Sequence, residues 1–138
     1  NKHLYYKNGK TGWEEGSDFL TGFVTYWELF DEIHIMSIGV RREYTNLKIA
    51  TLLIYECIKR VSLKSFDKII LEVRVSNKSA INLYNNFGFK IVGERKNFYP
   101  DNLENAFIMS LSEIRSKQYK SKIKKIGKLI EDKSHSLY

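Results

Sequence analysis

A carboxylate and a phenol that stand twelve positions apart are the residues of this 138-residue chain best placed for chemistry. Glu72 lies in the stretch 68–75, whose apolar and β-branched residues predict a strand. Ser76 and Asn77 then offer N-cap side chains, and the helical spacing of the apolar residues that follow places Tyr84 inside a helix. We therefore expect both side chains near the carboxyl end of a strand, where α/β sheets bind ligands.

Other segments must position this pair. Gly88 stands where the end of the helix needs a positive φ. Apolar periodicity predicts strands over residues 4–6, 19–29, 33–40, 89–95 and 104–111, and an amphipathic helix over 46–61. Polar connections are expected over residues 11–17, 41–45 and 97–102, with a turn at 8–9. This order of strands and helices predicts an α/β (α+β) domain.

The composition is that of a folded globular domain, with 43% hydrophobic and 14% aromatic residues. No run of 18 apolar residues and no signal peptide is visible, so we expect a cytoplasmic protein without a membrane span. Cys57 is the only cysteine, which excludes an internal disulfide and fits a reducing compartment. Because Cys57 shares the apolar stripe of the 46–61 helix, we expect core packing rather than a nucleophile.

The net charge of +7 is concentrated at the C-terminal end. Residues 1–113 contain 15 Lys and Arg against 14 Asp and Glu, whereas residues 114–138 contain 8 against 2. We therefore divide the chain into a domain, 1–113, and a basic amphipathic tail, 114–138.

The tail has an apolar stripe, formed by Ile114, Tyr119, Ile123, Ile126 and Ile130. The stripe predicts a helix that packs on its own domain or on a neighbour, although Gly127 weakens any long helix. A membrane-surface helix and an arm that contacts ribosomal RNA are the alternatives.

The stretch 71–90, which reads LEVRVSNKSAINLYNNFGFK, resembles the GNAT acetyltransferase superfamily. Within it the chain is similar, from about Gly22 to Leu111, to enzymes that acetylate protein N-termini, both the bacterial ribosomal-protein alanine type and the eukaryotic type. The resemblance implies a GNAT fold, in which a mixed central sheet is flanked by helices and its splayed central strands hold acetyl-CoA. It also implies a first strand and two helices that form one wall of the peptide groove. Only about twenty residues precede Gly22 here, so that wall is short or missing, and the acceptor stays open.

The resemblance also implies where acetyl-CoA binds. Its pantetheine arm is expected along the backbone of Ile38, Gly39 and Val40, and Asn77 and Tyr84 match further cofactor-contacting positions. The phosphate loop of the family matches a segment made of Thr45, Asn46, Leu47, Lys48, Ile49 and Ala50, with Thr51 beside it. Lys48 replaces a glycine of the family pattern, which adds a Cβ where the backbone approaches the phosphates. Arg41, Arg42 or Lys48 itself is expected to replace the basic residue that Thr45 lacks.

Glu72 matches the general base of the family and Tyr84 its general acid, which protonates the departing CoA sulfur. A peptide α-amine has a reference pKa of about 7.7–8.0, so a carboxylate that acts directly or through one water suffices to deprotonate it. The alternative for Glu72 is an ion pair with Arg74 on the same face of the strand, and for Tyr84 a place in the core. His34 matches a position that helps to hold the catalytic water, or it accepts the proton itself; a structural histidine is the alternative.

The acceptor site is expected around four side chains, which are His34, Met36, Phe98 and Tyr99. We expect His34 to share a face of its strand with Met36 and Ile38, and the paired aromatics to cover the substrate's N-terminal residue. The predicted reaction is acetyl transfer from acetyl-CoA to a protein N-terminal amine in a ternary complex, without a metal. A lysine or small-amine acetyltransferase and a non-catalytic GNAT-fold auxiliary subunit are the alternatives. The ribosome or an auxiliary subunit is a possible partner of the tail, and no specific DNA binding is expected.

Overall fold

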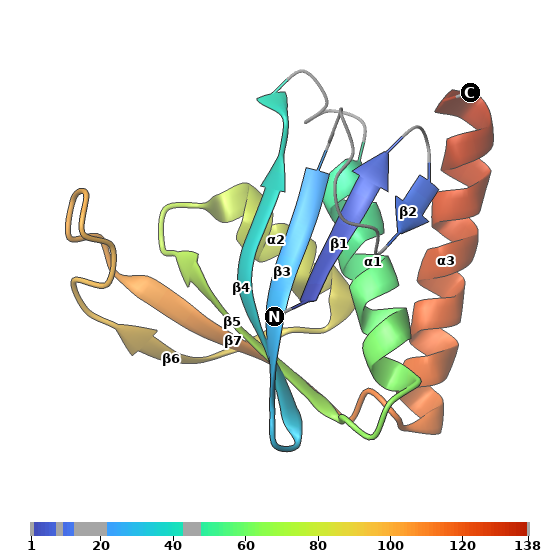
Figure 1. The fold of residues 1–138 in the computed structure, drawn as a ribbon. Helices are drawn as coiled ribbons and strands as arrows, with labels where there is room; N and C mark the ends of the chain where they lie inside the picture. The colour runs from blue at the N-terminus through green and yellow to red at the C-terminus, as the bar shows by residue number, and fades with distance from the viewer. Residues whose placement is uncertain (1, 8–9, 13–21, 43–47, 138) are drawn as a thin grey trace.

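The computed structural model describes residues 2–7, 10–12, 22–42 and 48–137. One seven-stranded sheet has the order β2-β1-β3-β4-β5-β7-β6. Its strands are β1 (Lys2–Lys7), β2 (Lys10–Gly12), β3 (Gly22–Leu29), β4 (Glu32–Val40), β5 (Lys68–Arg74), β6 (Lys90–Arg95) and β7 (Ala106–Ser112). The helices described are α1 (Ile49–Ser62), α2 (Lys78–Phe87) and α3 (Lys117–Leu137) (Figure 1).

The sheet consists of two halves that share a short parallel ladder. β4 pairs with β5 only from Glu32↔Lys68 to Ile35↔Leu71, although β4 continues to Val40. Beyond this point β4 stays paired with β3, and β5 stays paired with β7. The two central strands therefore diverge toward their carboxyl ends, as Figure 1 shows, and the resemblance to the splayed GNAT sheet is confirmed.

A β-bulge lies where β4 leaves β5. On the β3 side, Thr25 pairs with Ser37 but Tyr26 pairs with Ile35, so Met36 is an extra residue in β4. A bulge bends its strand and increases the local twist. Because Met36 directly follows the last residue that pairs with β5, the bulge turns β4 away from β5 at that position.

The core fills the space between one face of the sheet and the helices. Val24, Ile33, Ile69 and Leu71 are almost completely buried there, together with the inward face of α1. Cys57 on α1 belongs to this core, and burial raises the pKa of its thiol to about 12. The prediction of a packed, unreactive cysteine is therefore confirmed.

The segment that carries Glu72 and Tyr84 folds as predicted. β5 is followed by α2, and the Asn77 side chain caps α2 by accepting a hydrogen bond of 3.2 Å from the Ala80 amide. Gly88 ends the helix with a φ of 101°. The sequence was sufficient to predict this segment because helix caps and turn residues act within a few positions of one another.

Smaller differences concern element ends. The polar connection predicted over 11–17 is wrong at its start, because Thr11 and Gly12 belong to β2, which pairs with β1. The predicted turn at 8–9 and residues 13–21 lie outside the described residues, so the first part of the predicted 19–29 strand does too. The predicted 46–61 helix is α1, and its residues 46 and 47 lie outside the described residues as well.

The tail forms a helix that packs on its own domain, in agreement with the prediction from its apolar stripe. Ile114 and Tyr119 are buried, and the Tyr119 hydroxyl donates a hydrogen bond of 2.7 Å to the Phe87 carbonyl. α3 runs beside α1 in Figure 1. Its helical ladder continues through Gly127, so the weakening expected from this glycine does not end the helix.

Close packing explains Gly127. A Cβ at this position would lie 2.3 Å from the Tyr55 hydroxyl oxygen of α1 and 2.8 Å from its Cζ atom. Glycine costs helix stability but allows the two helices to approach each other. Tertiary packing therefore outweighs local propensity here.

This close approach predicts that the effect of Gly127→Ala on stability changes sign when Tyr55 is removed. Gly127→Ala should destabilise the protein by about 1–3 kcal/mol, the usual cost of overpacking. In a Tyr55→Ala background the same change should stabilise by up to about 1 kcal/mol, because only the helix propensity remains. Denaturant unfolding of the four variants measures both effects, and the same sign in both backgrounds would contradict the packing explanation.

Candidate active site

Glu72 and His34 meet across the two central strands. The His34 imidazole Nε2 and the Glu72 carboxylate Oε2 are 2.7 Å apart, with side chains 24% and 12% exposed. His34 is in register with Ile70 on β5, so Glu72 is two residues further along the same face. The contact therefore lies where the parallel ladder between β4 and β5 ends.

Glu72 has a second partner that the sequence did not indicate. Arg95, at the end of β6, places its Nε 3.4 Å from Glu72 Oε1. The alternative of an ion pair between Glu72 and Arg74 is wrong, because the carboxylates that Arg74 contacts are those of Asp101 and Glu104. Glu72 is on β5 and Arg95 on β6, and β7 lies between these two strands in the sheet, so no local pattern could have indicated that Arg95 reaches Glu72.

The bulge changes which residues lie on the same face of β4 as His34. Cross-strand partners share a face, and His34 pairs with Trp27, whereas Ile38 pairs with the fully buried Val24. The prediction that His34, Met36 and Ile38 share one face is therefore wrong, since the extra residue Met36 inverts the alternation. Ile38 faces the core, and Met36 is 45% exposed at the bulge itself.

Tyr84 lies on the core side of α2. Its side chain is 4% exposed, and its ring lies 5.7 Å from that of Phe89. Burial, with a smaller effect of Tyr99, raises the pKa of the Tyr84 phenol to about 12. Its hydroxyl makes no hydrogen bond within the described part of the chain. The phenol therefore keeps its proton at neutral pH and has a donor to offer.

The outer part of β4 exposes backbone toward the gap. Ile38, Gly39 and Val40 lie beyond the last pair with β5, so the edge that faces β5 has no strand partner there among the described residues. Such an edge can pair with an extended ligand. Gly39 has a packing reason of its own, because a Cβ there would lie 2.7 Å from the Phe23 ring.

The first turn of α1 has an unusual backbone. Lys48, the N-cap residue, is exposed and has a φ of 60° and a ψ of 25°. A non-glycine residue pays about 1–2 kcal/mol for this left-handed conformation. A glycine would adopt the same conformation without that cost.

Other residues of the predicted phosphate site differ in what they can contribute. The Ile49 side chain is buried, so only its amide can contact a ligand, whereas Ala50 and Thr51 are partly exposed. The amides of a helix's first turn have no acceptor within the helix. Arg41 and Arg42 are exposed after β4. Thr45, Asn46 and Leu47 lie outside the described residues. The Asn77 side-chain oxygen is occupied by the cap of α2.

Phe98 and Tyr99 lie in the loop 96–105 between β6 and β7. Their rings meet edge to face, with centroids 5.0 Å apart at 88°. Burial raises the pKa of Tyr99, Arg74 lowers it, and the Glu72 carboxylate raises it. Since Tyr99 also affects Tyr84, its phenol lies within electrostatic reach of both residues.

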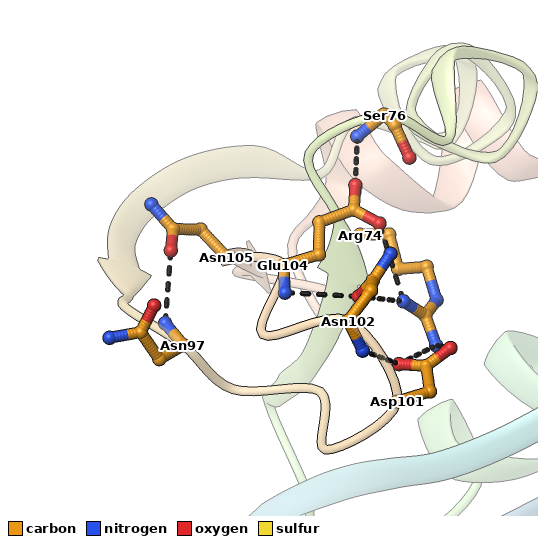
Figure 2. A network of polar contacts seen from close by, with 7 residues as sticks. All are labelled: Arg74, Ser76, Asn97, Asp101, Asn102, Glu104 and Asn105. Atoms are coloured by element: carbon orange, nitrogen blue, oxygen red, sulfur yellow. Dashed lines mark hydrogen bonds and ion pairs between the residues drawn. The ribbon is translucent and has the colours of Figure 1, made fainter.

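A polar network attaches this loop to the end of β5 (Figure 2). Arg74 binds both carboxylate oxygens of Asp101, at 3.1 and 3.0 Å, and contacts Glu104 at 3.3 Å. Glu104 also accepts a hydrogen bond of 2.8 Å from the Ser76 amide. Hydrogen bonds from Ser76 and then Arg74 lower the pKa of Glu104. Its contribution to stability is therefore present at neutral pH and is lost as the pH falls below the ordinary carboxyl range.

A family model described as "Acetyltransferase (GNAT) family" matches residues 3–89 of this chain. The chain belongs to the GNAT acetyltransferase family. The match includes the divergent central strands β4 and β5 and the helices α1 and α2 that follow them.

Relatives of this GNAT chain have related names. It is 32% identical over 94 residues to the ribosomal protein bS18-alanine N-acetyltransferase of Escherichia coli, covering 67% of this chain and 64% of the relative. It is 40% identical over 78 residues to an N-alpha-acetyltransferase of Sulfurisphaera tokodaii, covering 56% and 46%. The chain thus spans less than two thirds of these curated relatives. The crystal structure of the ribosomal-protein-S18-alanine N-acetyltransferase from Escherichia coli matches with a TM-score of 0.69 and 28% identity, covering 80% of this chain and 68% of that one.

The GNAT domain thus brings several of the predicted residues together and turns the Ile38 side chain away from His34. Glu72 and His34 are in contact, and Tyr99 lies within electrostatic reach of Glu72 and Tyr84. Ile38 turns into the core. Within the described residues, no group of three His, Cys, Asp or Glu side chains could hold a metal ion, and no helix has the length and apolar character to cross a membrane.

Proposed function

We propose that this GNAT domain transfers the acetyl group of acetyl-CoA to the N-terminal α-amino group of a protein or peptide. The observation that carries the proposal is the contact of 2.7 Å between His34 and Glu72 where β4 and β5 separate. It supplies a proton acceptor beside a gap that an extended donor can enter. The names of the relatives favour an N-terminal amine as the acceptor. The single buried cysteine fits a reducing compartment, and we place the reaction in the cytoplasm.

Acetyl-CoA would bind between the diverging strands. Its pantetheine amides would pair with the free edge of β4 around Gly39, and its pyrophosphate would meet the first-turn amides of α1. The positive φ of Lys48 supports this placement, because it reproduces the backbone that a glycine would give. The Lys48 ammonium group adds positive charge at this end of α1, and the exposed Arg41 follows β4.

His34 and Glu72 would act together as the base. The Glu72 carboxylate accepts the hydrogen bond from His34 Nε2, which orients the ring and leaves Nδ1 to take a proton from the ammonium group or from one bridging water. The neutral amine then attacks the thioester carbonyl carbon. As the C–N bond forms, the carbonyl π electrons move to oxygen, and backbone amides can stabilise that oxyanion.

Tyr84 would assist departure of the thiolate. When the tetrahedral intermediate collapses, the C–S bond breaks and its electron pair stays on sulfur, which the Tyr84 hydroxyl can hydrogen-bond and protonate. Free thiols have a pKa of about 8.5, so a phenol with a pKa of about 12 gives most of its benefit as a hydrogen-bond donor. Overall an ammonium group and a thioester give an amide, a thiol and one released proton.

The acceptor class can be tested with two matched peptides. One has a free N-terminus and no lysine, and the other has a blocked N-terminus and one lysine. We expect acetylation by acetyl-CoA of the first peptide only. Equal rates would instead favour a lysine acetyltransferase. If calorimetry finds no binding of acetyl-CoA at millimolar concentration, the domain is a non-catalytic binding module and the proposal fails.

Because His34 and Glu72 are in contact, we predict that their mutations do not affect turnover independently. Glu72→Gln and His34→Gln should each lower turnover by roughly 10²–10⁴, the range for losing a general base. The double variant should lose little more than either one, because the two residues form one unit. Glu94→Gln, an exposed carboxylate on β6, is the matched control. Additive losses would show that the residues act separately, and near-native turnover in all variants would remove both from the mechanism.

The exposed side of α3 fits a polyanionic partner, and we propose ribosomal RNA. Its exposed lysines have no ion-pair partner among the described residues, and they are Lys117, Lys120, Lys122, Lys124, Lys125 and Lys128. The apolar side of α3 already packs on the domain, which disfavours insertion into a membrane surface.

Replacing Lys117, Lys124 and Lys128 by Gln should weaken binding to ribosomal RNA. The slope of the logarithm of the binding constant against the logarithm of the salt concentration should become shallower by roughly 0.7–0.9 for each phosphate that a lysine no longer neutralises. Lys59→Gln and Lys68→Gln, on other elements, are the controls. Activity on a free peptide should stay unchanged. RNA binding that does not differ between the two sets would contradict the proposal, and capture of an acidic protein alone would favour an auxiliary subunit.

A further inference from the structure

We propose that Arg74 is a positioning residue of the acceptor site, which holds the loop 96–105 and its Tyr99 ring against the strand that carries Glu72. The inference rests on the proposed function, since it assigns the loop to the acceptor. Arg74 and Glu72 stand two positions apart on β5 and point to the same face. Of the cations on β5, Arg74 is therefore the one nearest to Glu72, and it can hold the loop beside that carboxylate.

Both terminal nitrogens of the Arg74 guanidinium group make contacts. The NH2 group donates to both carboxylate oxygens of Asp101, the NH1 group lies 3.2 Å from the Asn102 side-chain oxygen, and NH1 also contacts Glu104 (Figure 2). The guanidinium carbon lies 3.9 Å from the centre of the Tyr99 ring. Two carboxylates neutralise this cation, so it is not available for the phosphates of a donor. Its contacts hold the loop instead.

The loop needs such support because part of its backbone is strained. Asn97 and Leu103 have φ angles of 53° and 57°, a conformation that costs free energy for residues other than glycine. The Leu103 amide donates to the Tyr99 carbonyl at 2.8 Å, and the Asn97 amide donates to the Asn105 side chain at 2.9 Å. These local bonds shape the turn, and the Val75 amide joins the loop to the end of β5 by donating to the Asn105 carbonyl at 3.1 Å. The side-chain links between the loop and the end of β5 are those of Arg74 and Glu104 (Figure 2).

The position of Tyr99 gives this support a role in the reaction. Its ring is fixed between Arg74 and Phe98, within electrostatic reach of the candidate base and acid. In the proposed acceptor site this ring stands beside the amine that reaches Glu72. Loss of the guanidinium group should therefore misplace the acceptor more than the donor.

The conservative variant Arg74→Lys keeps the charge but has one donor nitrogen in place of two, so it cannot reach Asp101 and Glu104 from two separate nitrogens, and it removes the planar stacking. We expect the KM for the acceptor peptide to rise about tenfold, the equivalent of roughly 1.4 kcal/mol. The KM for acetyl-CoA and kcat should change much less. In a Tyr99→Leu background the same change should have little effect on the peptide KM, because the ring that Arg74 holds is gone. Arg115→Lys, at an exposed position before α3, is the matched control.

Hydrogen exchange of the Phe98, Tyr99 and Leu103 amides gives a readout independent of activity. Arg74→Lys should speed exchange in this loop and leave α1 unchanged. An unchanged loop overturns the inference, whether or not the wild-type protein acetylates peptides. Faster exchange with an unchanged peptide KM also overturns it, because Arg74 would then support only the fold. A wild-type protein that acetylates no peptide refutes the proposed function, while the exchange result still decides whether Arg74 holds the loop.

Discussion

The parallel ladder between β4 and β5 is four residue pairs long, and the candidate site depends on where it ends. Each strand keeps its outer partner, so the divergence leaves backbone groups unpaired only along the facing edges. Buried or partly buried peptide groups need hydrogen-bond partners. A sheet that opens in its centre therefore creates a place for an extended ligand with amides of its own. The bulge at Met36 sets that position, because it bends β4 directly after the last pair.

The end of the β4–β5 ladder also determines where the candidate catalytic residues lie. Glu72 directly follows the last β5 residue that pairs with β4 and stays paired with β7, so its contact with His34 lies at the edge of the gap. The cost of exposing backbone is confined to the outer part of β4, where a donor can offset it by binding. Tyr84 comes from the core side of α2 and its phenol stays protonated through burial. In the proposed mechanism Glu72 and His34 supply the base, and the protonated Tyr84 phenol supplies the acid.

How much the sequence could predict follows from the range of each interaction. β5, the cap at Asn77 and the positive φ of Gly88 depend on neighbouring residues, and all were predicted correctly. The bulge at Met36 depends on pairing with β3, so the face of Ile38 was assigned wrongly. The contacts of Glu72 with Arg95 and of Arg74 with Asp101 join residues more than twenty positions apart, and charged residues are too common for spacing to indicate them. Gly127 is explained only by Tyr55 on another helix.

The central claim is that acetyl-CoA pairs with the free edge of β4 beyond the bulge. Hydrogen exchange of the amides of Ser37–Val40, measured with and without acetyl-CoA, tests it most directly. The account predicts that amides directed toward β5 become protected when acetyl-CoA is added, while those bonded to β3 and those of β7 stay as they were. Protection confined to the start of α1, or an unchanged β4, would contradict the account, because the donor would then bind without using the opening of the sheet.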